Sequence, residues 1–217
     1  MSTAPILSTA ARHSSESNEH YTPSMVVEAA RIALGAIDLD PASCAVANER
    51  VRADRFFSYG DNGYRQPWFG RVFLNPPGGM SDNKERPVKQ KCRETGSCGL
   101  PLPHAHEGVE ASAKKWWFKL SREFAAGRVS SAVFVGFSVE ILQNTQVDTP
   151  AGLAVPLDFA MAFPAKRVAY MRPDGAAGTQ PPHASVIVCV TRDAVVRSRF
   201  ESAFSTMGRV VVPVGAS

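Results

Sequence analysis

Short apolar segments with strand character alternate with amphipathic helical segments along most of this chain, and no other feature limits its fold as strongly. The strand patterns cover residues 37–40, 71–74, 131–137, 168–171, 184–190 and 210–214. The helix patterns, counted with their capping residues, cover 22–35, 45–51, 112–127 and 193–208. Elements that alternate in this way pack as a sheet with helices on its faces. The sequence therefore predicts an α/β fold with a largely parallel sheet.

The ends of the helices carry their own signals. Thr22 can cap the first helix, Pro23 suits its first position and Gly35 suits its end. Asp193 can cap the last helix, which should end near Gly208.

Length and composition favour a single domain. The chain has 217 residues, of which 44% are hydrophobic, enough for one sizeable core. We expect this domain over residues 20–217, after a polar and disordered lead-in at 1–19. The lead-in lacks the basic and then apolar stretches of a secretory signal, and no apolar run approaches the roughly 20 residues of a membrane span. A cytoplasmic location and no membrane partner are therefore expected.

Cysteines and net charge constrain the function less. Disulfides are not expected in a reducing compartment, so Cys44 and Cys189, which lie among apolar residues, are predicted to be packing residues. The net charge of +4 and the pI of about 9.0 are compatible with a polyanionic partner without requiring one.

Two of the predicted strands end in polar residues that are locked by proline. Asp38-Leu39-Asp40-Pro41 ends one strand, and Asn75-Pro76-Pro77 ends the next. In open α/β sheets, ligands bind outside the carboxyl ends of the strands. Each proline fixes its own φ at about −65° and restricts the residue before it. The Asn75 side chain and the Pro76 carbonyl therefore point in set directions.

This turn suits a reaction at a weakly nucleophilic amine. An exocyclic amine on a heteroaromatic ring has its lone pair delocalised into the ring. Two acceptors on its two N–H groups hold the nitrogen and favour the positive charge that develops as it takes a methyl group from a sulfonium. Asn75 Oδ1 and the Pro76 carbonyl can be those acceptors, and the gain would come from positioning and preorganised dipoles. A plainer interpretation stays open, because Asn-Pro is also a common turn signal.

Several segments, taken in order, resemble the phage-type, Dam-like DNA adenine-N6 methyltransferases. The matching segments are His20-Tyr21-Thr22-Pro23, Ile37-Asp38-Leu39-Asp40-Pro41-Ala42-Ser43, Ala47-Asn48, Phe56-Phe57, Asp61-Asn62-Gly63, Trp68-Phe69-Gly70 and Arg71-Val72-Phe73-Leu74-Asn75-Pro76-Pro77-Gly78-Gly79. The stretch from Val135 to Leu142 is similar to a later part of the same family. The resemblance covers about residues 20–205.

This resemblance implies a Rossmann-like methyltransferase sheet, S-adenosylmethionine as the methyl donor and a flipped-out adenine of double-stranded DNA as the acceptor. Asn75, Pro76 and Pro77 then form the catalytic turn. The cofactor is expected between Tyr21-Thr22-Pro23 and the loop from Asp38 to Ser43.

Within that loop the resemblance makes Asp40 the best candidate to hold the ammonium or the ribose of the cofactor. Asp38 can instead be structural and face the first helix. A later acid, Asp54 or Asp61, can reach the ribose, and the sequence does not choose between them.

The chain departs from the usual methyltransferase pattern at two places. The first strand is followed by Pro41-Ala42-Ser43-Cys44 rather than by a glycine-rich loop. Related enzymes often follow Asn-Pro-Pro with an aromatic residue that stacks on the extruded base, and this position is Gly78. Stacking must then come from elsewhere, and the candidates are Phe69, Trp116 and Trp117. Because the two tryptophans are adjacent on a helix, we expect one to lie in the core and the other to be free to stack on the base.

Residues 79–110 differ from the rest of the chain and are predicted to be an inserted loop. They contain Cys92, Cys98, His104 and His106, a set of four zinc-type ligands. A loop of this length without a core needs something to hold it, and a structural zinc site would do so. The alternative is a flexible loop with incidental Cys and His. The basic residues around Cys92 can contact phosphates or can simply form a solvated face. The insert is predicted to be the DNA-recognition element.

Two other functions stay open on the sequence alone. Gly78 and the basic insert also fit a nucleic-acid-binding protein with a catalytically degenerate methyltransferase fold. Asn-Pro-Pro turns also serve other amine acceptors, glutamine among them.

Overall fold

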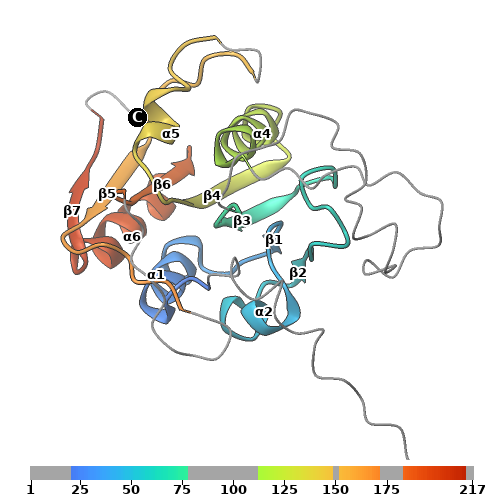
Figure 1. The fold of residues 1–217 in the computed structure, drawn as a ribbon. Coiled ribbons are helices and arrows are strands. Elements are labelled where there is room, and N and C mark those ends of the chain that lie inside the picture. Colours follow the sequence, from blue (N-terminus) through green and yellow to red (C-terminus); the bar gives the residue numbers. More distant parts are fainter. Residues whose placement is uncertain (1–20, 78–111, 149–151, 172–182, 214–217) are drawn as a thin grey trace, which may run out of the picture.

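The computed structural model describes residues 21–77, 112–148, 152–171 and 183–213 (Figure 1). In chain order the elements of these residues are α1 (Ser24–Leu34), β1 (Leu39–Asp40), α2 (Ala45–Val51), β2 (Arg55–Phe56), β3 (Gly70–Leu74), α4 (Ala113–Ala125), β4 (Val129–Gly136), α5 (Glu140–Gln143), β5 (Ala160–Pro164), β6 (Val186–Thr191), α6 (Ala194–Ser205) and β7 (Gly208–Val211).

The strands form one seven-stranded sheet in the order β2-β1-β3-β4-β6-β5-β7. The first four are parallel to one another, β6 is antiparallel to β4 and β5, and β7 is antiparallel to β5. Five strands therefore run in one direction, while β6 and β7 run in the other. The chain has a mixed α/β fold with a mostly parallel sheet, which confirms the predicted fold class and is compatible with a Rossmann-like arrangement.

Helices cover both faces of the sheet (Figure 1). The core on one face is built by α1 and α6 with the end of α2, and it includes Leu34, Val51 and Phe200. The core on the other face is built mainly by α4 and α5, and it includes Trp117, Leu120 and Leu142. The alternating side chains of the central strands contribute to both, because successive residues of a strand point to opposite faces.

Several predicted helix ends are confirmed. Asp193 caps α6, and its Oδ1 accepts from the N–H groups of Val195 (2.7 Å) and Val196 (3.4 Å). Gly35 ends α1 with φ +79°, a left-handed conformation that glycine adopts at little cost. The predicted helix 45–51 is α2, but its cap is Cys44, whose sulfur accepts from the Ala47 N–H at 3.4 Å. Only Cys189 is the fully buried packing residue that the sequence predicts.

Other elements differ from the prediction. Thr22 does not cap α1, because the N-cap is Pro23 and no side chain caps the helix. The predicted strand 168–171 is wrong: Met171 forms only an isolated bridge with Tyr21, and the strand in this part of the chain is β5. The short elements β2 and α5 were not expected, because two and four residues carry no readable period.

The lead-in 1–19 and the whole inserted loop 79–110 lie outside the described residues, so both stay predictions. In the part of the chain that is described, no helix has the length and apolar character needed to span a membrane.

Candidate active site

The order of the strands reverses between β1 and β3. From β1 the chain passes through α2 to β2 on one side of β1, and β3 then pairs with the other side. At such a switch point the loops that leave adjacent strands diverge, and ligands of open α/β sheets bind outside the carboxyl ends there. The two proline-locked turns of the sequence, after Asp40 and at Asn75, are the turns that follow β1 and β3.

Asn75 joins the end of β3 to the segment in front of α1. Its Nδ2 donates a hydrogen bond to Thr22 Oγ1 at 3.0 Å. Thr22 is buried, with 7% of its surface exposed. Residues far apart in the sequence, which the resemblance assigned to the acceptor turn and to the cofactor, therefore touch one another.

Tyr21 connects the same segment to two other parts of the chain. Its backbone forms a β-bridge with Met171, and Cys44 Sγ lies 3.7 Å from its hydroxyl oxygen. The segment Tyr21-Thr22-Pro23 thus contacts the loop after β1, the turn after β3 and the region before β6. The structure brings these sequence-predicted residues together at the carboxyl ends of the parallel strands.

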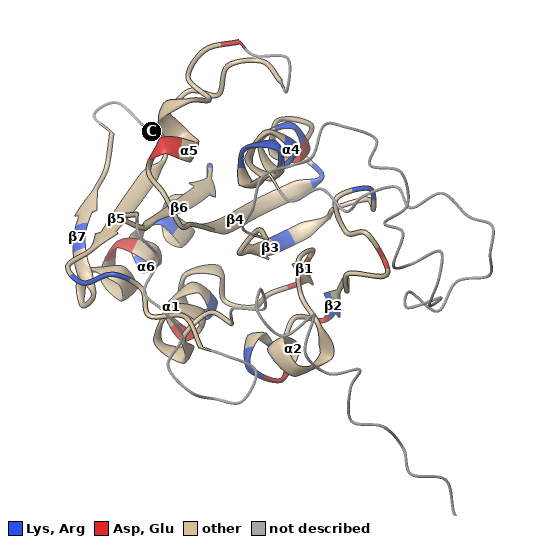
Figure 2. Ribbon diagram, in the orientation of Figure 1, with Lys and Arg blue, Asp and Glu red and all other residues tan. Residues whose placement is uncertain are grey.

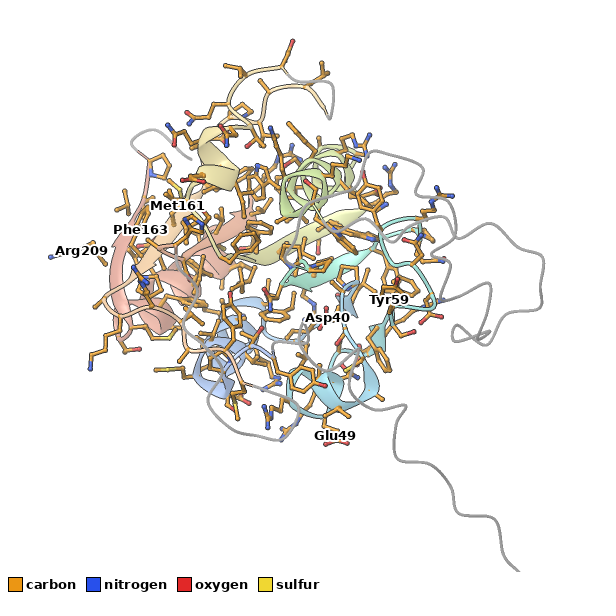
Figure 3. All side chains as sticks on the ribbon, viewed as in Figure 1. Asp40, Glu49, Tyr59, Met161, Phe163 and Arg209 are labelled. Atoms are coloured by element: carbon orange, nitrogen blue, oxygen red, sulfur yellow. The ribbon has the colours of Figure 1, made fainter. Side chains whose placement is uncertain are left out.

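Asp40 is the buried acid of this edge, with 3% of its surface exposed (Figure 3). Burial, which disfavours the charged form, raises the pKa of its carboxyl to about 7. The Ala42 N–H, which donates to Oδ1 at 3.2 Å, and the nearby Ser43 hydroxyl only partly oppose this shift. No cationic side chain among the described residues pairs with Asp40.

Ser43 supplies a second buried polar group beside Asp40. Its Oγ is buried and forms no hydrogen bond of normal geometry within the described residues, although it lies near enough to favour the charged form of Asp40. Buried polar groups are normally hydrogen-bonded, so a free one requires an explanation. A ligand with donor groups would satisfy both Ser43 and Asp40.

Asp38, two residues before Asp40, is placed differently. Its carboxylate accepts from Arg71 Nε (2.9 Å), Arg71 Nη2 (2.5 Å) and the Arg71 backbone N–H (2.7 Å). These hydrogen bonds hold the pKa of Asp38 below its usual range. Asp38 therefore faces Arg71 of β3, not the first helix as the sequence analysis suggested, and its oxygens are occupied by the protein.

The two later acids, Asp54 and Asp61, lie at opposite ends of the parallel strands. Asp54 precedes β2, and its N–H donates to Ile37 O, at the amino ends of the parallel strands. Asp61 follows β2, on the edge that holds Asp40, and its Oδ2 accepts from Ser58 N (2.7 Å) and Ser58 Oγ (2.6 Å). Of the two acids, only Asp61 lies on the side of the candidate site.

Gly63 is a further residue of the site, and its functional signal in the sequence was only the turn Asp61-Asn62-Gly63. An ideal Cβ at Gly63 would lie 1.9 Å from the Pro41 carbonyl oxygen, so only glycine permits this contact. Trp68 Nε1 donates to Gly63 O at 2.9 Å, and Ser43 N donates to Phe57 O at 2.9 Å. The loop after β2 is thereby fixed against the turn that carries Asp40.

The expected aromatic partners for a base are not at this edge. Trp116 and Trp117 are both buried, at 2% and 0% exposure, and Trp116 packs against Trp68 with ring centroids 5.7 Å apart. The prediction that one of the two is free is therefore wrong. Phe69 is exposed but precedes β3, at the amino ends of the parallel strands. The half-buried Phe137 directly follows β4, the neighbour of β3, and packs against the core on the α4 face.

A cavity of about 640 Å³ lies elsewhere, between the C-terminal half of α4 and the end of β6. Its lining includes Arg122, Phe124 and Arg192, and it includes none of the residues around Asn75 and Asp40. The candidate site is therefore defined by the position of Asn75 and Asp40 at the carboxyl ends of the neighbouring strands β3 and β1, where ligands of this fold class bind.

Metal ligands are not gathered in the described part of the chain, where no three His, Cys, Asp or Glu residues are arranged to hold an ion. Cys92, Cys98, His104 and His106 lie outside the described residues, and the zinc site stays a prediction. Comparison with protein-family models, with curated proteins and with solved structures found no match to this chain.

Proposed function

We propose that this chain is an S-adenosylmethionine-dependent methyltransferase that acts on the N6 amine of adenine in double-stranded DNA. One observation carries the proposal. The Asn75 amide, at the carboxyl end of β3, and the buried Asp40, at the carboxyl end of β1, flank the point where the strand order reverses. An acceptor for an amine and an anionic group for a cationic cofactor are the two groups that such a reaction requires.

The residues around Asp40 fit the cofactor. S-adenosylmethionine, when bound, supplies a methyl group on a sulfonium and presents an ammonium and ribose hydroxyls to the protein. Asp40 can accept from the ammonium or a hydroxyl, and the unsatisfied Ser43 Oγ can bind a second polar group. Asp61, on the same edge, can reach the ribose. A buried acid without a protein cation fits a ligand that brings its own positive charge.

Asn75 and Pro76 act on the acceptor. With Nδ2 engaged by Thr22, Asn75 Oδ1 is the amide atom left to accept from the adenine amine, and the Pro76 carbonyl accepts the second N–H. Pro76 is buried, and each proline limits the rotation of its neighbour, so these acceptors are preorganised. Such acceptors stabilise positive charge as it develops on the nitrogen, without a general base acting first.

The charge on α4 supports a polyanionic partner. The helix has one acid, Glu123, which pairs with the buried Lys119, and its other bases Lys114, Lys115 and Arg122 are partly or fully exposed, while both signs mix on α1, α2 and α6 (Figure 2). Its first turn follows the inserted loop, which we propose as the DNA-recognition element.

A second candidate function keeps the enzyme and changes the acceptor. The burial of both Trp116 and Trp117 removes two of the expected partners for a flipped base, and this favours an amine that needs no stacking. Methylation of free glutamine or of a protein amide by the same chain, with none of DNA, would establish it.

The test is tritiated methyl transfer from S-adenosylmethionine to unmethylated double-stranded DNA, comparing the wild type with Asn75→Ala. The loss of one aligned acceptor should lower the rate by roughly 10²-fold or more. Asn144→Ala, at an exposed asparagine beyond α5, is the matched control and should transfer at the wild-type rate. Equal rates for the wild type and Asn75→Ala would refute the role of Asn75.

A further inference from the structure

The reaction proposed above needs the Asn75 amide in one of its two orientations. The amide carries an acceptor oxygen and a donor NH₂ group, and rotation about the terminal torsion exchanges their positions. Only Oδ1 can accept from a substrate amine. With the amide turned over, its NH₂ group would face the N–H groups of the substrate, and two donors cannot bond. Something in the protein must therefore select the productive orientation.

Thr22 contacts the amide directly. Asn75 Nδ2 donates to Thr22 Oγ1 at 3.0 Å, and Thr22 is 7% exposed, so water does not readily replace this partner. In this orientation Thr22 Oγ1 accepts from Nδ2 and Oδ1 is directed away from Thr22. A turned-over amide would have to accept the Thr22 O–H through Oδ1 instead, which would require the hydroxyl to rotate.

The chain on both sides of Thr22 is held in place. Tyr21 N donates to Met171 O at 2.8 Å, and Met171 N donates to Tyr21 O at 2.9 Å. Pro23 has a restricted φ of −58°, and its carbonyl accepts from Val26 N and Val27 N at the start of α1. The Thr22 hydroxyl is thus presented to Asn75 by backbone fixed on two sides, which also explains why this threonine is not the cap of α1.

We propose that Thr22 is a positioning residue, which holds the Asn75 amide with Oδ1 available to the substrate amine. This inference rests on the proposed function, because the orientation of the Asn75 amide affects the rate only if Oδ1 binds the substrate amine. The orientation itself is given by the Thr22–Asn75 hydrogen bond. It differs from the sequence expectation, which placed Thr22 among the residues that hold the cofactor. A positioning role predicts a loss in kcat, whereas a cofactor-binding role predicts weaker binding of S-adenosylmethionine.

The experiment compares Thr22→Val, which keeps the shape and removes the hydroxyl, with Thr22→Ser, which keeps the hydroxyl. In Thr22→Val we expect kcat for DNA methylation to fall about tenfold, the effect of one neutral hydrogen bond, with the Kd for S-adenosylmethionine within twofold of the wild type. Thr22→Ser should restore most of kcat. Thr22→Val added to Asn75→Ala should cause no further loss, because the amide it positions is gone.

A readout that does not need activity is the side-chain amide of Asn75 in ¹⁵N-labelled protein. The proton that is bonded to Thr22 Oγ1 should be slow to exchange in the wild type and in Thr22→Ser, and fast in Thr22→Val. The positioning role would be overturned if the exchange rate of the Asn75 amide were the same in Thr22→Val as in the wild type. It would also be overturned if Thr22→Val bound S-adenosylmethionine more weakly while kcat stayed unchanged. If wild type and Asn75→Ala methylate DNA equally, the proposed function fails, while the amide signals still decide whether Thr22 orients Asn75.

Discussion

Asp38 and Asp40 lie two residues apart at the same strand, yet the pKa values of their carboxyl groups are shifted in opposite directions. Asp38 accepts three hydrogen bonds from Arg71, and its pKa is held below the usual range. Asp40 is buried without a cationic partner, and its pKa is raised to about 7. The first arrangement stabilises the pairing of β1 with β3. The second costs stability and is typical of a group kept for a ligand.

Position along the strand explains the difference. Asp38 precedes β1, where Arg71 of the neighbouring strand can reach it, whereas Asp40 ends β1 at the edge where ligands bind in this class of fold. Opposite charges on neighbouring strands, such as Asp38 and Arg71, stabilise one pairing register. A protein cation beside Asp40 would instead compete with a cationic ligand. The comparison can be tested by removing each charge in turn.

The largest expected effect is on the pH dependence of stability. The folded-state pKa of Asp40 lies above its ordinary value of 3.8, so the folded protein binds the proton more tightly than the unfolded chain does. The stability from this group is present below pH 4 and is lost as the pH rises through about 7. A shift from 3.8 to about 7 is roughly 3 pKa units, or on the order of 4 kcal/mol of unfolding free energy.

Asp40→Asn removes this titration without changing the size of the side chain. Urea unfolding at pH 5 and pH 8, without ligand, should show the variant more stable than the wild type at pH 8, with a smaller difference at pH 5. Asp38→Asn is the control and should keep the wild-type slope between these two pH values. Parallel pH profiles for the wild type and Asp40→Asn would contradict a buried, unpaired carboxyl.

The next effect is on ligand binding. A hydrogen bond between an ammonium and a carboxylate is charge-assisted, so Asp40→Asn should weaken the binding of S-adenosylmethionine by about 10²-fold in calorimetry at pH 8. Asp38→Asn should bind within twofold of the wild type, because its oxygens already bind Arg71. Equal losses of affinity for S-adenosylmethionine in the two variants would contradict a ligand-binding role for Asp40 and a structural role for Asp38.

Much of the fold was predictable, because its long elements have clear periods and caps. The α/β class, α2, α4 and α6 follow from helical spacing and from residues such as Ser112 and Asp193. The antiparallel insertion of β6 between β4 and β5 was not predictable, since it depends on pairing between distant segments. For the same reason β5 was missed, and the segment 168–171 was predicted as a strand although it forms a single bridge.

The site was predictable in its residue types and not in its contacts. Proline beside Asp40 and Asn75 marked two turns, and the parallel sheet brings those turns to one edge. The partner of Asn75 was hidden, because Thr22 before Pro23 has the sequence pattern of a helix cap and nothing local indicates a contact 53 residues away. The burial of both Trp116 and Trp117 was also hidden, because the second tryptophan packs against Phe134 of β4.

The smallest effect is the stability that Asp38 contributes. Its pKa is lowered by Arg71, so its contribution is present above the unfolded pKa of about 4 and is lost as the pH falls through the folded-state value. Arg71 is 36% exposed, and solvent therefore weakens the pair, so Asp38→Asn should lower the unfolding free energy at pH 7 by about 1–2 kcal/mol. A double-mutant cycle with Arg71→Gln should recover most of this value as coupling at pH 7, and the coupling should fall as the pH is lowered and Asp38 becomes protonated. A coupling energy that does not change as Asp38 becomes protonated would mean that packing, and not the charge of Asp38, joins β1 to β3, and the contrast with Asp40 would then lose its electrostatic basis.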